Sequence, residues 1–415
     1  MNFRKVTALT LSAVTAASLL AGCGSGSKSS GTEGKSGSSK GATTITVWGP
    51  QEDQSKENGE WLQTECKAFA KAHPEWNIKF KYGTCSEGDA GKNVTKDPSA
   101  AADVYMFAND QLGTLLDANA ISELGGDTLN QVKSDNSEAM VNTVTFNGSV
   151  YGVPFTGNTW FLYYDKSKFS DDDVKSLDTM MQKGTVACQI ANGWYLGSFF
   201  AANGGTFFGK DGQDEKAGIQ LGDGASKVTD YLIDAVASGK LVNDNNGSAL
   251  SNFGKGVDAF FSGSWDYTKA ADAIGKDKLG VATLPTITID GEAKQMKSFA
   301  GSKAIAVNPN CKNPKIAVAL AAFLGSKDAQ EAHYKTRNII PTVSSVDVGD
   351  DVLAKVQAET IDKNSVLQSS FSEMGKWWDP AAALGNGILD GSITKSNSAE
   401  QTATLQDQVN SSAVK

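Results

Sequence analysis

Thr44-Ile45-Thr46-Val47-Trp48 opens the part of the chain that decides the fold. Its apolar and polar side chains alternate, as in a half-buried β-strand, and Gly49-Pro50 ends the pattern. A polar loop follows. Apolar residues then recur at the spacing of an amphipathic helix, at Leu62, Cys66 and Phe69. The segment therefore predicts a strand followed by a helix.

The same alternation of elements continues along the chain. Strands are predicted at 78–82 and 103–107, and Leu112, Leu115 and Leu116 fit a helix. Further strands are predicted at 150–154 and 161–166, and further helices at 228–235 and 315–324. Strand, helix, strand, strand, helix is an α/β order, and it predicts a mostly parallel sheet.

Polar side chains follow the first and third predicted strands, where each strand ends. In open α/β sheets, ligands bind beyond the carboxyl ends of the strands. These side chains are therefore candidate ligand contacts: Gln51, Glu52, Asp53, Asn109, Asp110 and Gln111.

The start of the chain carries an export signal. A basic start and the apolar run 6–20 precede Leu20-Ala21-Gly22-Cys23, which resembles a bacterial lipobox. We predict a signal peptide at 1–22, a diacylated Cys23, and a flexible Gly/Ser linker over 23–41. The protein is then extracytoplasmic and lipid-anchored to the cell membrane, as on the surface of a Gram-positive-type bacterium. A plain signal peptide or a spanning helix is the alternative, but the run is short of the ~20 residues that spanning needs.

Composition narrows the class of protein. The remaining chain is long enough for two domains, and a net charge of −9 argues against nucleic acid as a partner. Only Arg337 remains as arginine once the signal is removed, which disfavours a strongly anionic ligand. His73 and His333 lack the spacing of metal ligands, so we expect no metal, and we expect both on the surface.

The cysteines other than Cys23 leave two alternatives open. An exported protein can form disulfides, and Cys66 and Cys85 could come close. Alternatively, all four remain buried apolar residues: Cys66, Cys85, Cys188 and Cys311.

Six of the eight tryptophans divide into two groups by their surroundings. Trp61, Trp76 and Trp160 are predicted to fill cores. Trp194, Trp265 and Trp378 instead stand beside Gly, Asp, Asn or Pro, which mark the edges of loops. An indole stacks on the apolar face of a pyranose, while carboxylates and amides bind its hydroxyls. The pattern therefore indicates a neutral sugar ligand.

The ordered motifs resemble the extracytoplasmic solute-binding lipoproteins of carbohydrate ABC transporters, close to the maltose/maltodextrin-binding group. The longest resembling run is Phe260 to Leu324, including Phe261-Ser262-Gly263-Ser264-Trp265. Earlier and later motifs also match: Tyr151-Gly152-Val153-Pro154, Leu162-Tyr163-Tyr164-Asp165-Lys166, Ala201-Ala202-Asn203-Gly204-Gly205 and Trp377-Trp378-Asp379-Pro380. The resemblance covers nearly the whole mature chain.

The resemblance implies a two-lobed periplasmic-binding-protein-like α/β fold. Each lobe would be a mostly parallel sheet flanked by helices, with a hinge between the lobes. The first lobe would hold 42–155 and 302–345, and the second 156–301 and 346–415. Ligand would lie in the cleft between them.

The resemblance also implies roles for individual residues. Trp194, Trp265 and Trp378 match stacking residues of the family, with Trp377 beside them as a further candidate. Asp110 matches a hydroxyl-binding residue, and the Glu52/Asp53 loop fits the polar loop after the first strand. Two departures concern Phe107, where the family has a stacking Trp, and Asn158, where it has an acidic residue.

The function implied is capture of neutral oligosaccharides, above all maltooligosaccharides. The lobes would close on the ligand, and a membrane permease would receive it. The protein would be a monomer without a cofactor and not an enzyme. Another neutral oligosaccharide is the alternative ligand. A glycoside hydrolase, which needs two carboxyl groups across the scissile bond, and a peptide-binding protein are the remaining readings.

Overall fold

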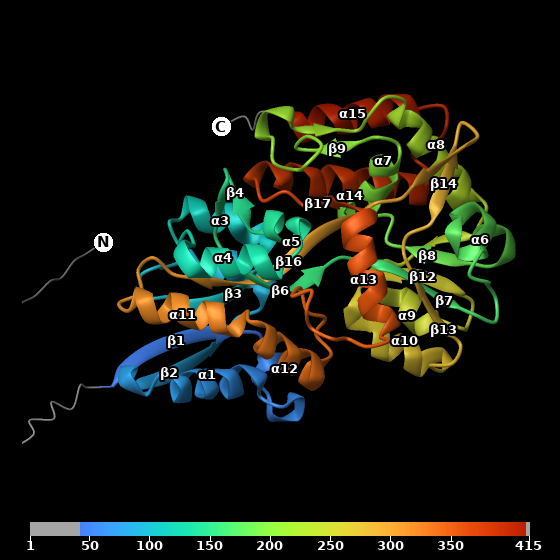
Figure 1. Cartoon of the computed structure of the whole chain (residues 1–415). Coiled ribbons are helices and arrows are strands. Elements are labelled where there is room, and N and C mark those ends of the chain that lie inside the picture. Colours follow the sequence, from blue (N-terminus) through green and yellow to red (C-terminus); the bar gives the residue numbers. More distant parts are fainter. Residues whose placement is uncertain (1–41, 412–415) are drawn as a thin grey trace, which may run out of the picture. The chain divides into compact units, whose positions relative to one another are not determined.

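The computed structural model describes residues 42–411. The predicted signal peptide, linker and lipidation site at Cys23 lie outside these residues. The predicted helices and strands named above form, except that the segment 150–154 is broken at 151–152 and divides between two strands. Two groups of strands organise the described chain (Figure 1).

The first sheet contains the strand that opens the fold. Its order is β17-β16-β3-β1-β2, with β6 also paired to β16. Strand β1 is parallel to β2 and β3, whereas β16 is antiparallel to β3 and β6. The strands are β1 (Thr43–Gly49), β2 (Ile78–Thr84), β3 (Val104–Ala108), β6 (Val153–Asn158), β16 (Ser298–Val307) and β17 (Ser365–Leu367).

The second sheet has the order β11-β8-β12-β7-β13. Strand β8 is parallel to β11 and β12, and β7 is antiparallel to β12 and β13. Both sheets are therefore mixed. The strands are β7 (Phe161–Asp165), β8 (Val186–Cys188), β11 (Leu241–Asn243), β12 (Ala259–Ser262) and β13 (Leu279–Ala282).

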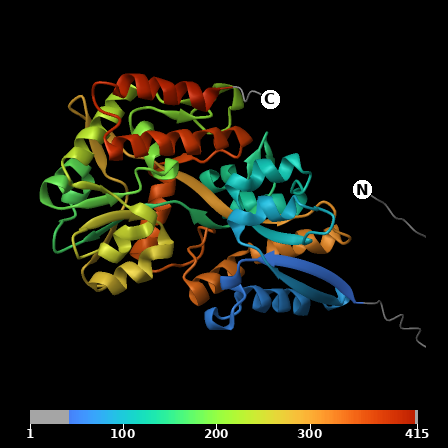
Figure 2. The same cartoon turned by 180° about the vertical axis from the view of Figure 1, so that it is seen from behind.

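Helices cover both sheets, and each sheet has a core of its own (Figures 1 and 2). With the first sheet lie α1 (Trp61–Ala72), α2 (Ala90–Val94), α3 (Leu112–Asp117), α4 (Gly126–Asp135), α5 (Glu138–Thr143), α11 (Pro314–Leu324) and α12 (Lys327–Arg337). With the second lie α6 (Leu177–Lys183), α7 (Gly193–Ala202), α8 (Ala225–Ala237), α9 (Ser248–Asn252), α10 (Tyr267–Ile274), α14 (Gly375–Asp390) and α15 (Ser398–Asn410).

Three two-stranded sheets lie beside the two main sheets in the described residues. They pair β4 (Thr145–Phe146) with β5 (Ser149–Val150), β9 (Thr206–Phe207) with β10 (Ile219–Gln220), and β14 (Thr286–Ile289) with β15 (Glu292–Gln295).

The chain crosses between the two sheets more than once. Strand β6 of the first sheet leads through Thr159 and Trp160 directly into β7 of the second. Helix α13 (Val352–Lys363) contacts β6, β16 and β17 as well as β7 and β13, and Figure 1 shows it between the two groups of strands. The fold is thus two-lobed, with several connections between the lobes.

The four described cysteines are all free, so none of them forms a disulfide. Three are buried, as the second alternative expects, namely Cys66, Cys85 and Cys188, whereas Cys311 is partly exposed. Burial raises the pKa of the Cys66 thiol to about 12, so this thiol is protonated at neutral pH. Separately, none of the helices within 42–411 has the length and apolar character to cross a membrane.

Candidate functional site

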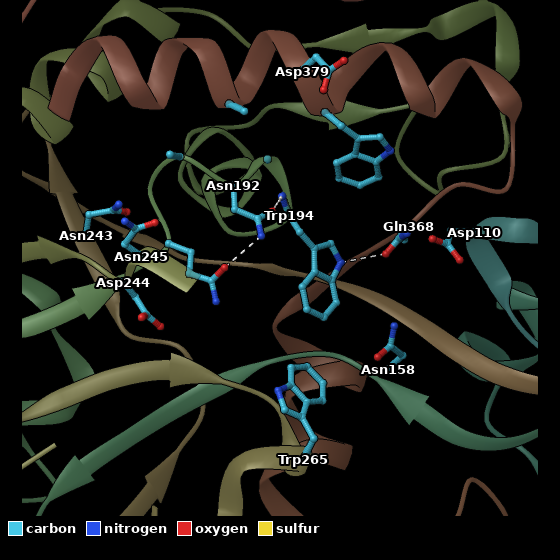
Figure 3. A pocket seen from close by; sticks show the side chains of 15 residues that line it. Asp110, Asn158, Asn192, Trp194, Asn243, Asp244, Asn245, Trp265, Gln368 and Asp379 are labelled. Carbon is cyan, nitrogen blue, oxygen red and sulfur yellow. Dashed lines mark hydrogen bonds between the residues drawn. The ribbon is translucent and has the colours of Figure 1, made fainter. Parts of the chain in front are cut away.

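The carboxyl ends of strands from both sheets converge on a cavity of about 620 Å³, which we call the aromatic pocket (Figure 3). Three indoles and many amide and carboxylate groups line it. None of its described lining residues is Lys, Arg or His. The lining comprises Asp110, Asn158, Gln189, Ala191, Asn192, Gly193, Trp194, Asn243, Asp244, Asn245, Trp265, Gln368, Trp378, Asp379 and Ala382.

Trp194 enters the pocket from the first turn of α7. Asn192 caps this helix, because its side-chain oxygen accepts the Trp194 main-chain N–H at 3.0 Å. The indole Nε1–H of Trp194 donates to Oε1 of Gln368 at 2.9 Å, as Figure 3 shows. One edge of the ring is therefore fixed by a hydrogen bond.

Trp265 follows β12 in a short 3-10 turn and is 50% exposed. Its ring folds back over Gly263, where a Cβ atom would lie 2.0 Å from the ring. The Trp194 and Trp265 rings stack at a centroid distance of 6.0 Å and an angle of 26°. A sugar between two rings needs about 3.5–4 Å on each of its faces. This spacing is too short for a sugar to lie between the two rings.

Trp378 supplies the third indole from α14. It is partly buried and meets Phe299 edge-on at a centroid distance of 5.9 Å. Its neighbour Trp377 is fully buried, and its Nε1–H donates to the Gly193 carbonyl at 2.9 Å. The two adjacent tryptophans therefore have different surroundings: Trp377 supports the N-terminus of α7, and Trp378 faces the cavity.

A second cavity of about 380 Å³ adjoins the first and shares Asn158 and Trp265 with it. We call it the charged pocket because six ionisable side chains line it: Glu52, Asp53, Glu87, Lys303, His333 and Arg337. Glu87 is buried, and its carboxylate lies 3.3 Å from the Lys303 ammonium.

Asp53 is the centre of a buried ion-pair cluster in the charged pocket. Its Oδ1 lies 2.8 Å from Nε2 of His333 and also accepts from the Arg337 guanidinium. Burial alone would raise the pKa of the Asp53 carboxyl, but His333 and Arg337 together lower it below its ordinary value. Trp61 stacks on His333 at 3.8 Å and closes the cluster from the core side. The cluster ties the loop after β1 to α12.

The predicted site residues therefore separate into two sets. Asp110, Asn158, Trp194, Trp265 and Trp378 meet in the aromatic pocket, whereas Glu52 lies exposed in the charged pocket. The other candidates lie outside the aromatic pocket, and each contacts other residues of the protein. They are Asp53 (in its cluster), Gln51 (accepting from Thr84 Oγ1 and lining neither pocket), Asn109 (bonded to Gln368 and Ser302), Phe107 (0% exposed, against Gly152) and Trp377.

One expectation about histidine is wrong. His333 is 1% exposed and not at the surface, because α12 turns it inward onto Trp61 and Asp53. His73 agrees with the expectation in part, since it is partly exposed and stacks on Trp76. Within the described residues, no group of His, Cys, Asp and Glu side chains is arranged to hold a metal ion.

Several lining residues escaped sequence reasoning. Asn243, Asp244 and Asn245 form a polar run directly after β11, and the strand-end rule could have found them. Gln368 follows a strand of only three residues and stands in an unremarkable polar stretch. No local pattern singled it out.

Comparisons with known proteins agree with this geometry. A protein solved with acarbose is 51% identical to this chain. The match covers 89% of this chain and 99% of the other, and the TM-score is 0.83. The maltodextrin-binding protein MalE1 from L. casei BL23, solved without ligand, is 27% identical over 89% of this chain and 100% of that chain, with a TM-score of 0.81.

Curated relatives are more distant but span nearly the full length. The galactooligosaccharide-binding protein of Bacillus subtilis (strain 168) is 23% identical over 94% of both chains. A maltooligosaccharide ABC transporter solute-binding lipoprotein of Streptococcus pneumoniae (strain ATCC BAA-255 / R6) is 25% identical over 97% of both. The profile of the bacterial extracellular solute-binding proteins matches residues 65–360. This chain belongs to that family of extracellular solute-binding proteins.

Proposed function

We propose that this protein captures neutral oligosaccharides in the aromatic pocket, with maltooligosaccharides as its ligands, and delivers them to the permease of an ABC importer. One observation carries the proposal: three indoles line a cavity together with amides and carboxylates, and no basic side chain lines it. Rings stack on the apolar faces of sugars, and the polar groups accept and donate hydrogen bonds to hydroxyls. The names of the relatives support the same ligand class.

Individual roles follow from the placement of each side chain. Trp194, Trp265 and Trp378 stack on successive sugar units. Asp110, exposed at the end of β3, accepts hydroxyl hydrogen bonds from the first lobe. Glu52 and Asn158 extend the polar contacts toward the charged pocket.

A second neutral oligosaccharide class is the competing ligand. The galactooligosaccharide-binding relative, which matches 94% of this chain, supports this alternative. The two classes differ in the direction in which successive sugars leave the stacking rings. The three indoles do not by themselves choose between them.

Calorimetric titration with maltotriose, maltopentaose and a galactooligosaccharide tests the proposal. Tight binding of the malto series supports it, and binding of the galactooligosaccharide alone would replace the ligand while keeping the class. Binding of neither would refute an oligosaccharide ligand. Release of reducing sugar from a saturating oligosaccharide would contradict the proposed role as a binding protein and favour hydrolysis.

We further propose that the protein is a monomer tethered to the membrane through Cys23. Retention of a Cys23→Ala variant in the membrane fraction would refute the tether. The proposed lobes are 42–155 with 302–345 and 156–301 with 346–415, although β17 and the ends of β6 and β16 near 158 and 298 pair within the first sheet. We propose that the lobes close around the ligand. Small-angle scattering tests closure, because a radius of gyration unchanged at saturating ligand would remove it.

A further inference from the structure

We propose that Gln368 is a positioning residue that fixes the Trp194 indole from the connection between the two lobes. The proposal rests on the proposed function where it gives Trp194 a role in stacking sugars. It does not rest on that function where it concerns the anchoring of the ring, which is a property of the ligand-free protein.

The first observation is the bond itself. Trp194 is carried by α7, but its Nε1–H donates to Gln368 Oε1 at 2.9 Å, 174 positions further along the chain. Gln368 is 4% exposed, so water competes little for the acceptor. The ring orientation is therefore set by a residue outside the helix that carries it.

The second observation is that the Gln368 main chain is held at both of its polar groups. Its N–H donates to the Ala300 carbonyl at 2.9 Å, and its carbonyl accepts from Asn109 Nδ2 at 3.0 Å. Ala300 belongs to β16, which runs antiparallel to β3 and β6 of the first sheet. The acceptor of the Trp194 bond is thus fixed relative to the first sheet.

The third observation extends the chain of contacts into the first lobe. Asn109 follows β3, and its Oδ1 accepts the Ser302 main-chain N–H at 3.1 Å. The side chain sits over Gly301, where a Cβ atom would lie 2.2 Å from Oδ1. Asn109, Gln368 and Trp194 therefore form a continuous path from the first sheet to the stacking ring of the second lobe.

Trp265 provides the contrast within the same pocket. It is half exposed, and no residue of the described chain accepts a hydrogen bond from its indole. It is held by contact with Gly263 and by stacking on Trp194. Of the two stacked rings, that of Trp194 is thus anchored by a hydrogen bond, whereas that of Trp265 is adjustable. The anchored ring sets the position of the adjustable one.

The consequence for binding is preorganisation. A ring already held in its binding orientation loses little freedom when a ligand arrives. Removing the acceptor at 368 should free the Trp194 ring and weaken maltooligosaccharide binding by about fivefold, the value of one net hydrogen bond. Because Gln368 is anchored to β16, movement between the lobes also shifts this acceptor.

Indole N–H hydrogen exchange, followed by NMR in the ligand-free protein, tests the anchor directly. In Gln368→Met we expect faster exchange at Trp194 Nε1–H. The Trp377 Nε1–H, which donates to Gly193, is the internal reference and should keep its rate. Gln357→Met makes the same change at a side chain 2% exposed, outside the aromatic pocket, and should leave Trp194 protected. Unchanged exchange at Trp194 in Gln368→Met would overturn the proposal.

A double-mutant cycle then tests whether Gln368 acts through Trp194. Trp194→Phe keeps an aromatic ring but removes the donor. In that background, adding Gln368→Met should change maltotriose affinity no further, whereas an equal loss in both backgrounds would overturn the positioning role. If Gln368→Met does not fold, Gln368→Glu keeps an acceptor oxygen and should keep Trp194 protected. Loss of protection there would also overturn it. If wild type binds no oligosaccharide, the proposed function fails while the exchange measurement still decides the anchor.

Discussion

The aromatic pocket and the charged pocket are neighbours built from the same kind of position, the carboxyl end of a strand, yet their acidic groups differ in state. In the aromatic pocket, Asp110 and Asp379 are exposed and Asp244 is buried, and none of the three has an ion-pair partner among the described residues. In the charged pocket, Asp53 and Glu87 are buried and paired with cations. Acidic residues are thus without a cation on one side of Trp265 and paired with cations on the other.

The comparison teaches that an acidic residue at a strand end is a ligand contact only while its oxygens remain free. Asp53 accepts from His333 and Arg337, so it has little capacity left for a hydroxyl. Its partners also come from a helix far away in sequence, α12, which the loop after β1 must hold in place. Substitutions in the charged pocket should therefore lower the stability of the protein, and substitutions in the aromatic pocket should lower its affinity for ligand.

The largest effect is expected at Asp53. Asp53→Ala leaves Arg337 and His333 without their anionic partner, and breaking a buried ion pair costs about 3–5 kcal/mol. Urea denaturation should show this loss in the free energy of unfolding, while the folded variant binds sugar nearly as wild type does. Glu52→Gln, one residue away and exposed, is the matched control and should stay within about 0.5 kcal/mol. Equal losses in both variants would break the comparison.

The pH dependence of stability sharpens the same point. Burial opposes the charged form of Asp53, but His333 and Arg337 favour it more, so its folded pKa lies below the unfolded value of about 3.9. The stabilisation is present in full above about pH 5 and is lost as the pH falls through the folded pKa. The difference in unfolding free energy between wild type and Asp53→Asn should therefore shrink as the pH falls below about 4. A difference that stays flat into that acidic range would contradict the assignment.

On the aromatic side, Trp265→Ala should cost about 2 kcal/mol in maltotriose binding, roughly thirtyfold in affinity, as for a buried aromatic anchor. Its stability should change little, because the ring is half exposed in the free protein. Trp61→Ala is the counterpart and should lower stability by about 3–5 kcal/mol while leaving intrinsic affinity nearly unchanged. Titration of the folded variants would refute the placement of the site if Trp265→Ala bound every tested sugar as wild type does.

Much of the fold was predictable because it rests on local patterns. The alternation at 44–48 and the helical spacing at 62–69 became β1 and α1, since each pattern reports which face of an element is buried. The mixed direction of the sheets was not predictable in this way. It depends on β16 and β7 running back between the lobes, which no short window of sequence records.

The site was predictable in its rings and less so in its polar groups. Trp194, Trp265 and Trp378 stood out because large aromatics beside loop residues are uncommon in a core. Asp53, His333 and Gln368 could not be sorted, because their roles depend on partners more than 170 positions away. Whether a polar group is free or engaged is a property of the folded chain.

The smallest predicted effect tests the adjustable ring. Gly263 has φ −94° and ψ −174°, which an alanine adopts without strain, so Gly263→Ala perturbs only what its new methyl group touches. That methyl would lie 2.0 Å from the Trp265 ring, which must therefore move off the turn and away from its stack on Trp194. We expect a loss of about 1 kcal/mol in maltotriose affinity, about fivefold, with thermal stability nearly unchanged.

Gly375→Ala is the control, because Gly375 has an ordinary helical backbone and open space around it, so affinity should stay unaltered. Gly275→Ala would not serve, because the positive φ of Gly275 adds strain of its own. If Gly263→Ala binds as tightly as wild type, the position of the Trp265 ring over the turn has no part in recognition, and the division into an anchored and an adjustable ring fails on its adjustable side.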